Sequence, residues 1–151
     1  MADALALFGP LPLYTSPLQR CRETAAALAA RWAAEAIVDD GGEVVTPADA
    51  PGSRGQWLDR FLHETWSTQP DALRSWRQRV LDTVTRIGIE GDAVVVTHFV
   101  AINAVVGAAT GDDRVVCFSP ANCSRTEVRV EADGTLHVVE LGDEIVRTVV
   151  G

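Results

Sequence analysis

A short run of β-branched residues at positions 93–97 constrains the fold of this chain most strongly. It follows Gly91, contains three consecutive valines, and leads through His98 into a second apolar run that starts at Phe99. An apolar run of this length next to a glycine predicts a strand buried on both faces, as in a mainly parallel sheet. Open α/β sheets bind their ligands at the carboxyl ends of such strands, which is where His98 is expected.

Length and charge narrow the class of protein. The 151 residues suit one domain, the net charge is −8, and all 13 basic residues are arginine. An acidic chain argues against nucleic acid as the partner, but a few arginines can still form a local anion pocket. No apolar run is long enough for a membrane, and the N-terminus lacks a signal peptide's basic residues. The three cysteines lack metal-ligand spacing, so we expect a cytoplasmic protein with reduced thiols and no metal.

Strand and helix patterns alternate along the chain. Ser16 is expected to cap a helix that reaches about residue 36, with Pro17 in its first turn and Gln19 completing a capping box. A second long helix is expected from about residue 70 to a stop at Gly88. The remaining expectations are a strand at 11–15, a loop at 37–56, helical spacing at 57–66, a helix at 99–109, a strand at 115–118 and a hairpin at 126–141. This order predicts a three-layer α/β/α fold, with a mostly parallel sheet and antiparallel edge strands.

Four positions stand out as candidates for chemistry. Arg20 is expected in the first turn of its helix, where the positive end of the helix dipole favours a bound anion. Arg20 could equally be an ordinary solvated arginine on the helix surface. His98 is either a switchable imidazole or a hydrogen-bonded strand-end residue. Glu43 lies in a glycine-rich segment, where most carboxylates are solvated. Asn122 and Ser124 lie in a polar loop that offers donors or simply forms a turn.

Residues 15–25, Thr-Ser-Pro-Leu-Gln-Arg-Cys-Arg-Glu-Thr-Ala, resemble the Ser-Pro-Leu-x-Arg-x-x-x-Thr-Ala segment of the histidine phosphatase superfamily, which includes the phosphoglycerate mutases. Residues 94–98, Val-Val-Val-Thr-His, are similar to the strand that carries the second histidine of that family. The two motifs occur in the family's order and the resemblance covers most of the chain. It implies a phosphoglycerate mutase-like fold.

The resemblance also implies a mechanism without metal or cofactor. One histidine attacks phosphorus and forms a phosphohistidine, while arginines and a second histidine bind the phosphoryl oxygens as their charge grows. A carboxylic acid protonates the leaving oxygen and later activates water. By position, Arg20 and His98 match pocket residues and Glu43 matches the proton donor, with Glu64 and Glu35 as weaker candidates. Ser16, Asn122 and Ser124 are expected to line the phosphate pocket.

The family's first strand, which ends in Arg-His-Gly and supplies the nucleophile, has no counterpart in this sequence. His63 and His137, the other histidines, neither follow an arginine nor precede a glycine. We therefore expect residues 1–151 to be one histidine-phosphatase-like domain that is N-terminally incomplete. In the family the absent strand lies beside the second-histidine strand. If residues 1–151 are the whole protein, we therefore expect another strand, a chain swap or a rearranged sheet to cover the edge of residues 93–97.

The interpretation we favour is a phosphomonoester hydrolase of the histidine phosphatase type, acting on a small phosphorylated substrate. One alternative is a catalytically inactive member that binds a phosphorylated ligand through Arg20 and His98. Another is an assembly module, in which the open edge of the sheet forms a homodimer. A mutase must retain its phosphoryl group and donate it again. Nothing in this sequence specifies that step.

Overall fold

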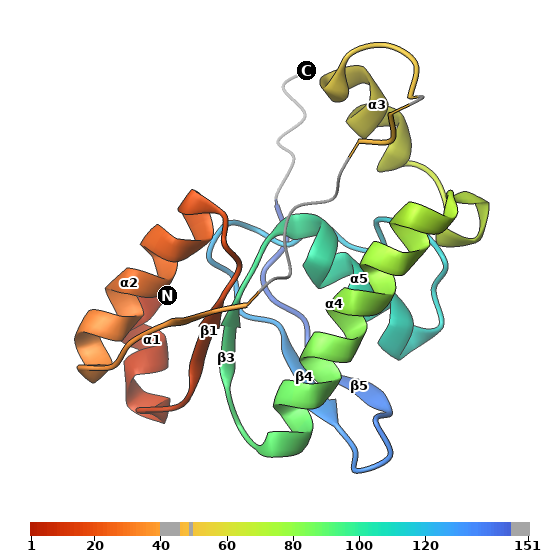
Figure 1. The fold of residues 1–151 in the computed structure, drawn as a ribbon. Helices are drawn as coiled ribbons and strands as arrows, with labels where there is room; N and C mark the ends of the chain where they lie inside the picture. The colour runs from red at the N-terminus through yellow and green to blue at the C-terminus, as the bar shows by residue number, and fades with distance from the viewer. Residues whose placement is uncertain (40–45, 49, 146–151) are drawn as a thin grey trace, which may run out of the picture.

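The computed structural model describes residues 1–39, 46–48 and 50–145, and its elements alternate between helix and strand (Figure 1). In chain order they are α1 (Ala2–Leu5), η1 (Ala6–Phe8), β1 (Leu13–Thr15), α2 (Gln19–Trp32), β2 (Ile37–Val38), α3 (Arg54–Phe61), η2 (Trp66–Thr68), α4 (Asp71–Glu90), β3 (Val94–Val96), α5 (Phe99–Thr110), β4 (Glu127–Val130) and β5 (Leu136–Glu140).

The predicted α/β class is confirmed, with one change in how the strands are grouped. Three parallel strands form a sheet in the order β2-β1-β3, in which Thr15 lies opposite both Val38 and Val96. Helices α1 and α2 lie on one side of this sheet, and α4 and α5 lie on the other (Figure 1). The antiparallel strands β4 and β5 form a pair of their own around Gly134, which has a φ of 87°, rather than the edge of the parallel sheet.

Helix boundaries differ from the expected ones at three ends. Helix α2 begins at Gln19 rather than beside Ser16, and it ends at Trp32 because Ala33 takes the left-handed conformation. Helix α4 continues through Gly88 to Glu90 and stops at Gly91, whose φ of 143° suits glycine alone. None of the helices in the described parts of the chain is both long and apolar enough to cross a membrane.

The strand expected at residues 115–118 does not form, because its backbone N–H groups bond to Asn103 and Glu64 instead of to a neighbouring strand. The N–H groups of Cys117 and Phe118 both donate to the amide oxygen of Asn103, at 2.9 and 3.1 Å. The N–H of Val115 donates to the carbonyl oxygen of Glu64 at 2.9 Å. The expected loop at 37–56 also contains more structure than its composition predicts, namely β2 and the start of α3.

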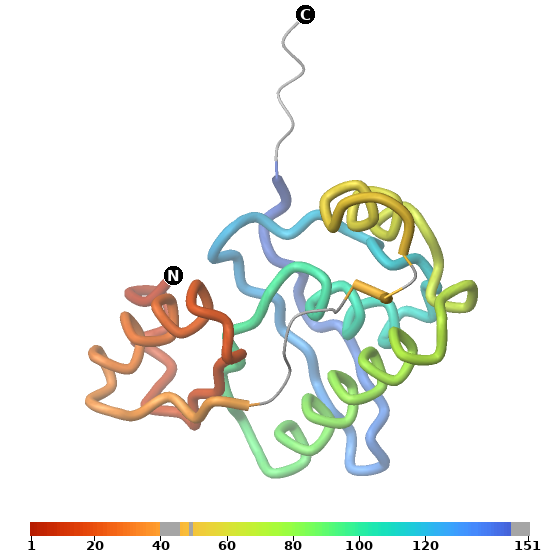
Figure 2. The backbone as a smooth tube through the Cα atoms, turned by 45° about the horizontal axis from the view of Figure 1, so that its top comes forward, coloured from red at the N-terminus to blue at the C-terminus, as the bar shows by residue number. Residues whose placement is uncertain are grey.

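Two separate hydrophobic cores hold the described residues together. The small core lies between α2 and the parallel sheet and contains Leu13, Ala25, Leu28 and Trp32. The aromatic core lies among α3, η2, α4, α5 and the β4–β5 pair, and it includes Trp57, Phe61, Trp66, Trp76 and Val100. In Figure 2 the elements of the small core lie at the left, apart from those of the aromatic core.

Strand β3 is less buried than its sequence predicts. All three of its valines are half-buried, so the expectation of burial on both faces is wrong. The cause is that β3 pairs with β1 on one side and, among the described residues, with no strand on the other. Among residues 1–39, 46–48 and 50–145, no further strand covers this edge of β3 as we expected.

Candidate functional site

The pairing of β1 with β3 brings the turn at Ser16 and the imidazole of His98 to one edge of the sheet. The two strands are parallel, and the N–H of Ser16 donates to the carbonyl oxygen of Val96 at 3.0 Å. Ser16 directly follows β1 and His98 follows β3 by two residues. Both residues thus lie at the carboxyl ends of neighbouring parallel strands, the place where sheets of this class bind ligands.

Ser16 is buried and does not cap the helix as predicted. Its hydroxyl oxygen accepts the N–H of Leu18 at 3.4 Å, and Leu18 takes the cap position of α2. The predicted capping box is absent because the side chain of Gln19 donates instead to the carboxylate of Glu23 at 2.7 Å. Arg20 is nevertheless the second residue of α2 and is exposed, so the residue lies in the first turn as expected.

His98 is the cap residue of α5 and is 7% exposed. Its ring lies against Trp76 of α4, with 6.2 Å between centroids and 42° between planes, and Nδ1 lies 3.5 Å from the hydroxyl of Thr97. Trp76 in turn stacks on Trp66 at 6.1 Å. An aromatic wall from the aromatic core therefore fixes the orientation of the imidazole.

The three tryptophans of residues 57–76 are all buried in the aromatic core. The structure shows that the internal Trp76 itself contacts His98, whereas Trp57 stacks on Phe61 at 5.0 Å, away from the imidazole along the same series of rings.

Asp39 directly follows β2 at the same edge of the sheet, and its side chain connects this edge to α4. Its N–H donates to Thr15 at 2.9 Å, and its carboxylate pairs with Arg86 at 2.9 Å and accepts the hydroxyl of Thr83 at 3.4 Å. The segment that follows contains Glu43, which lies outside the described residues, so its role as proton donor stays a prediction. These contacts place the start of that segment beside the site.

The weaker acid candidates have other settings. The carboxylate of Glu64 accepts the side-chain amide of Gln69 at 2.8 Å and belongs to the turn around η2. Glu35 is exposed in the connection between α2 and β2. Neither setting indicates a proton donor.

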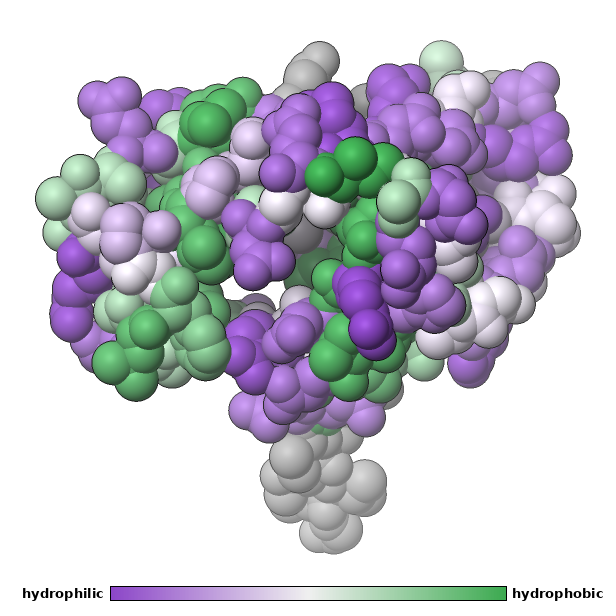
Figure 3. All heavy atoms as spheres, turned by 90° about the horizontal axis from the view of Figure 1, so that it is seen from below, coloured by the Kyte–Doolittle hydropathy of each residue, from purple (hydrophilic) through white to green (hydrophobic). Residues whose placement is uncertain are grey.

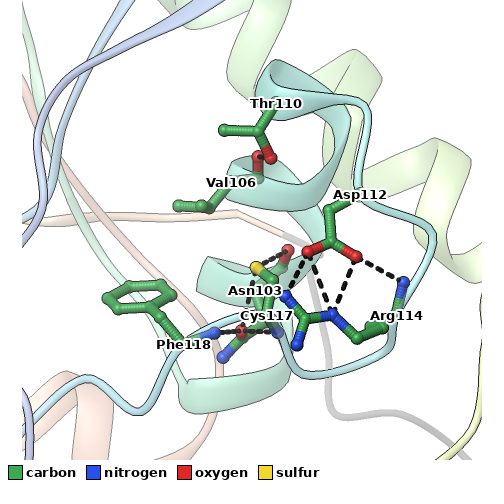
Figure 4. Close-up of polar contacts among 7 residues, drawn as sticks. All are labelled: Asn103, Val106, Thr110, Asp112, Arg114, Cys117 and Phe118. Carbon is green, nitrogen blue, oxygen red and sulfur yellow. Dashed lines mark hydrogen bonds and ion pairs between the residues drawn. The ribbon is translucent and has the colours of Figure 1, made fainter.

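Asn103 is the residue that sequence reasoning missed (Figure 4). Its side chain is fully buried within α5, and Nδ2 donates to the carbonyl oxygen of Phe99 at 3.1 Å while Oδ1 accepts the two N–H groups of Cys117 and Phe118. The available signal was a single amide in an otherwise apolar helix, because a buried amide needs partners. Asn103 thereby anchors the start of the loop that carries Asn122 and Ser124.

That loop is held mainly by backbone hydrogen bonds. The N–H of Ala121 donates to Asp143 at 2.7 Å, and the N–H of Ser124 donates to Ala121 at 3.1 Å. Asn122 is exposed and Ser124 is half-buried. The guanidinium of Arg125 lies 5.5 Å from the ring centroid of Phe8, which ties the loop to the N-terminal elements. Participation of Asn122 and Ser124 in a phosphate pocket stays a prediction.

Gly142 packs directly under this loop, and its replacement by alanine is expected to lower stability by about 1–3 kcal/mol. An added Cβ would lie 2.8 Å from both the carbonyl oxygen of Arg125 and the hydroxyl oxygen of Ser124, so the loop must move. Urea denaturation measures the loss. Gly55→Ala is the control, because a Cβ there meets nothing closer than 3.9 Å and lies in helix α3; equal stability of the two variants would contradict the prediction.

Other potential nucleophiles lie away from this edge or are held in an unreactive form. His137 pairs with Arg129 near the hairpin turn, whose Gly134 approaches Thr85 towards the far end of α4. His63 is exposed beyond the end of α3 and its Nδ1 lies 2.7 Å from the carbonyl oxygen of Asp59. Burial raises the pKa of the Cys117 thiol, which disfavours the thiolate. Across the described ranges no three His, Cys, Asp or Glu side chains gather as metal ligands.

Comparisons with known proteins agree with this architecture. A family model described as the histidine phosphatase superfamily (branch 1) matches residues 1–144. The native structure of mycobacterial glucosyl-3-phosphoglycerate phosphatase aligns with a TM-score of 0.65 and 18% identity, over 91% of this chain and 79% of that chain. Its complex with VO3 aligns with a TM-score of 0.59 and 23% identity, over 91% and 78%.

A structure named mycobacterial hydrolase 2 aligns with a TM-score of 0.65 and 19% identity, over 98% of this chain and 77% of that chain. No curated protein sequence matches this chain. At these identities the similarity to solved structures concerns the fold.

Proposed function

The chain belongs to branch 1 of the histidine phosphatase superfamily, and from this membership we propose that it binds the phosphoryl group of a small phosphomonoester between Arg20 and His98 for hydrolysis. The observation that carries the proposal is the hydrogen bond from Ser16 to Val96, which joins the carboxyl ends of β1 and β3. It holds the turn that leads to Arg20 beside the strand that leads to His98. These two segments are the ones that resemble the motifs of the family.

The chemistry of the two side chains suits a phosphoryl group. The guanidinium of Arg20 donates in pairs to phosphate oxygens, and its place in the first turn of α2 adds the positive end of the helix dipole. The imidazole of His98 donates one N–H, and the aromatic wall fixes its direction. Donors held in advance around the equatorial oxygens stabilise the charge that develops there during phosphoryl transfer. Glu43, at the end of the segment that starts at Asp39, is the proposed proton donor.

The question of which residue attacks phosphorus leads to a second candidate function. Transfer through a phosphohistidine needs an imidazole in line with the leaving oxygen, and of the three histidines in the sequence only His98 follows a strand of the parallel sheet. His98 serves as a pocket donor in this proposal. Binding of a phosphorylated ligand without turnover is therefore the alternative for these residues alone.

Isothermal titration calorimetry with orthovanadate and inorganic phosphate tests the pocket. Arg20→Gln and His98→Gln are each expected to weaken binding about tenfold or more, because each removes a hydrogen bond to a charged group. Arg22→Gln is the matched control, since Arg22 is exposed two residues further along the same helix. Unchanged affinity in both pocket variants would refute the proposed site.

Turnover of an aryl phosphate, measured on the same samples, separates the two candidate functions. Hydrolysis that disappears in His98→Gln and Glu43→Gln supports the phosphatase. Binding without hydrolysis supports the phosphate-binding alternative. The glucosyl-3-phosphoglycerate named for the similar mycobacterial phosphatase is one further ester to assay, because the shared fold supports a phosphorylated substrate of small size.

A further inference from the structure

We propose that an open polar cavity between η2, the first turns of α4 and the loop after α5, called the Arg77 cavity below, binds a small zwitterion of the α-amino acid class. The guanidinium of Arg77 holds the carboxylate of this ligand, and the carboxylate of Asp113 holds its ammonium group. The site does not depend on the proposed phosphatase function. The Arg77 cavity has a volume of about 260 Å³ and is lined by Trp66, Ser67, Arg74, Arg77, Gln78 and Asp113.

One wall of the Arg77 cavity is made where η2 is bonded to the loop after α5. The backbone N–H of Trp66 donates to the carbonyl oxygen of Asp113 at 2.8 Å. The N–H and the hydroxyl of Ser67 both donate to Oδ2 of the Asp113 carboxylate, at 3.2 and 2.5 Å. These three hydrogen bonds fix the carboxylate although Asp113 is exposed.

The other wall is one face of α4. Arg74, Arg77 and Gln78 are three and four residues apart in the helix, so they share a face. The guanidinium of Arg77 lies over the ring of Trp66, 5.4 Å from its centroid, and this contact fixes its position. Arg74 pairs with Asp71 in the first turn of α4. Arg77 is therefore the better placed of the two cations to bind a ligand.

The charges of Arg77 and Asp113 face each other across this cavity without touching. Burial lowers the pKa of the Arg77 guanidinium, and the nearby charge of Asp113 raises it. Within the part of the chain that the structure describes, Arg77 is half-buried and forms no ion pair. A partly buried cation is stabilised by an anion in contact with it, and no protein carboxylate fills that place here.

Two buried donors in the walls of the cavity also lack acceptors. They are Nε of Arg77 and Nε1 of Trp66, and neither has a hydrogen-bond partner among the described residues, although Trp66 is only 1% exposed. Buried donors in native proteins are nearly always bonded. A carboxylate beside Arg77 supplies two acceptor oxygens and matches the paired N–H groups of the guanidinium.

The carboxylate of Asp113 favours a zwitterion over a simple anion. Both hydrogen bonds from Ser67 go to Oδ2, so Oδ1 is left to accept from a ligand. An anion alone would be repelled by Asp113, whereas an ammonium group next to the ligand's carboxylate is attracted to it. The side of the molecule that carries η2 and the start of α4, at the right in Figure 3, is mainly hydrophilic, which suits a polar ligand.

The Arg77 cavity is distinct from the proposed phosphoryl site. His98 begins α5, whereas Asp113 lies beyond the end of this helix. Trp66 lines the cavity and stacks on Trp76, which in turn contacts His98, so two indole rings separate the cavity from the imidazole. Arg77 has no part in the proposed phosphatase reaction.

Titration of the whole chain with L-glutamine, followed by ¹H–¹⁵N NMR, tests the inference. L-Glutamine carries both charges of the zwitterion and a polar, uncharged side chain. We expect saturable shifts of the Ser67 amide and of the Trp66 indole N–H, whose signal is identified by its loss in Trp66→Phe. Acetate and methylammonium each carry one of the two charges and should bind at least about tenfold more weakly, because each leaves one charge of the cavity without a partner.

Variants of the two charged residues test their roles separately. Arg77→Gln and Asp113→Asn should each weaken L-glutamine binding about tenfold or more, and Arg77→Lys should also weaken it, because lysine keeps the charge but loses the paired donors. Arg79→Gln is the matched control, since Arg79 is exposed on α4 and does not line the cavity. Circular dichroism verifies the fold of each variant.

The two proposed sites are told apart by crossing their variants and ligands. Arg77→Gln should bind vanadate as the wild type does, and Arg20→Gln should bind L-glutamine as the wild type does. Three outcomes would overturn the inference. They are the absence of saturable shifts at about 10 mM L-glutamine, which is above the usual range of metabolite KM values, acetate binding as tightly as L-glutamine, and unchanged L-glutamine binding in Arg77→Gln.

Discussion

Replacement of Asn103 by leucine is expected to lower the free energy of unfolding by about 2–5 kcal/mol. The side chain is fully buried, and its amide oxygen accepts the N–H groups of Cys117 and Phe118. Leucine has nearly the same size but no acceptor, so two backbone donors would be left in the interior, each at a cost of about 1–3 kcal/mol. Urea denaturation followed by circular dichroism measures the change.

Asn122→Leu is the matched control for this experiment, because it removes the same amide from an exposed position. Its stability should stay within about 0.5 kcal/mol of the wild type. If Asn103→Leu were as stable as Asn122→Leu, then the hydrogen bonds at Asn103 would not be what holds residues 117 and 118. A lower affinity for phosphate in Asn103→Leu would in addition connect the loop of Asn122 and Ser124 to the pocket.

Truncation of Trp66 to alanine is expected to cost about 3–5 kcal/mol, the range for removing a large aromatic side chain from a core. Trp66 is 1% exposed and lies between Phe61 and Trp76, at 5.6 and 6.1 Å between ring centroids. The guanidinium of Arg77 also lies 5.4 Å from its ring centroid. Since Trp76 supports His98, the variant should weaken vanadate binding as well. Thermal and urea denaturation together with calorimetric titration check both effects.

Trp66→Phe separates the ring from the indole N–H. In the described structure this N–H has no hydrogen-bond partner, so its loss adds no broken bond, and the phenyl ring keeps part of the stacking. The expected loss is about 1–2 kcal/mol, with vanadate affinity nearly retained. If phenylalanine were as costly as alanine, an interaction of the indole N–H would have to replace packing as the explanation.

Much of the fold could be predicted because short sequence patterns determine where strands, turns and helix ends form. The apolar run before His98 forms β3, the glycine after Asp133 turns the hairpin, and Gly111 ends α5 in the left-handed conformation. The errors arose where a distant partner overrode local preference. Residues 115–118 have strand composition, but Asn103 from another element took their backbone donors. Preferences of neighbouring residues cannot predict a contact of this kind between two separate elements.

The candidate site divides in the same way. Arg20 and His98 were predictable because each is part of a short motif next to a strand, and the parallel pairing of those strands then places both motifs at one edge. The contact of Trp76 with His98, in contrast, depends on how α4 crosses the sheet. Neither the tilt of α4 nor the polar anchor at Asn103 follows from spacing along the sequence.

The division into two cores makes the affinity for a phosphoryl group depend on how the two cores are placed relative to each other. Arg20 belongs to α2 and the small core, whereas His98 is supported by Trp76 of the aromatic core. Among described residues, polar links between these parts include the pair of Asp39 with Arg86 and the contact of Arg125 with Phe8. A phosphoryl group held from both sides would favour one relative position of the cores. Contacts that fix this position would therefore raise the affinity for phosphate, and bound phosphate would stabilise those contacts in return.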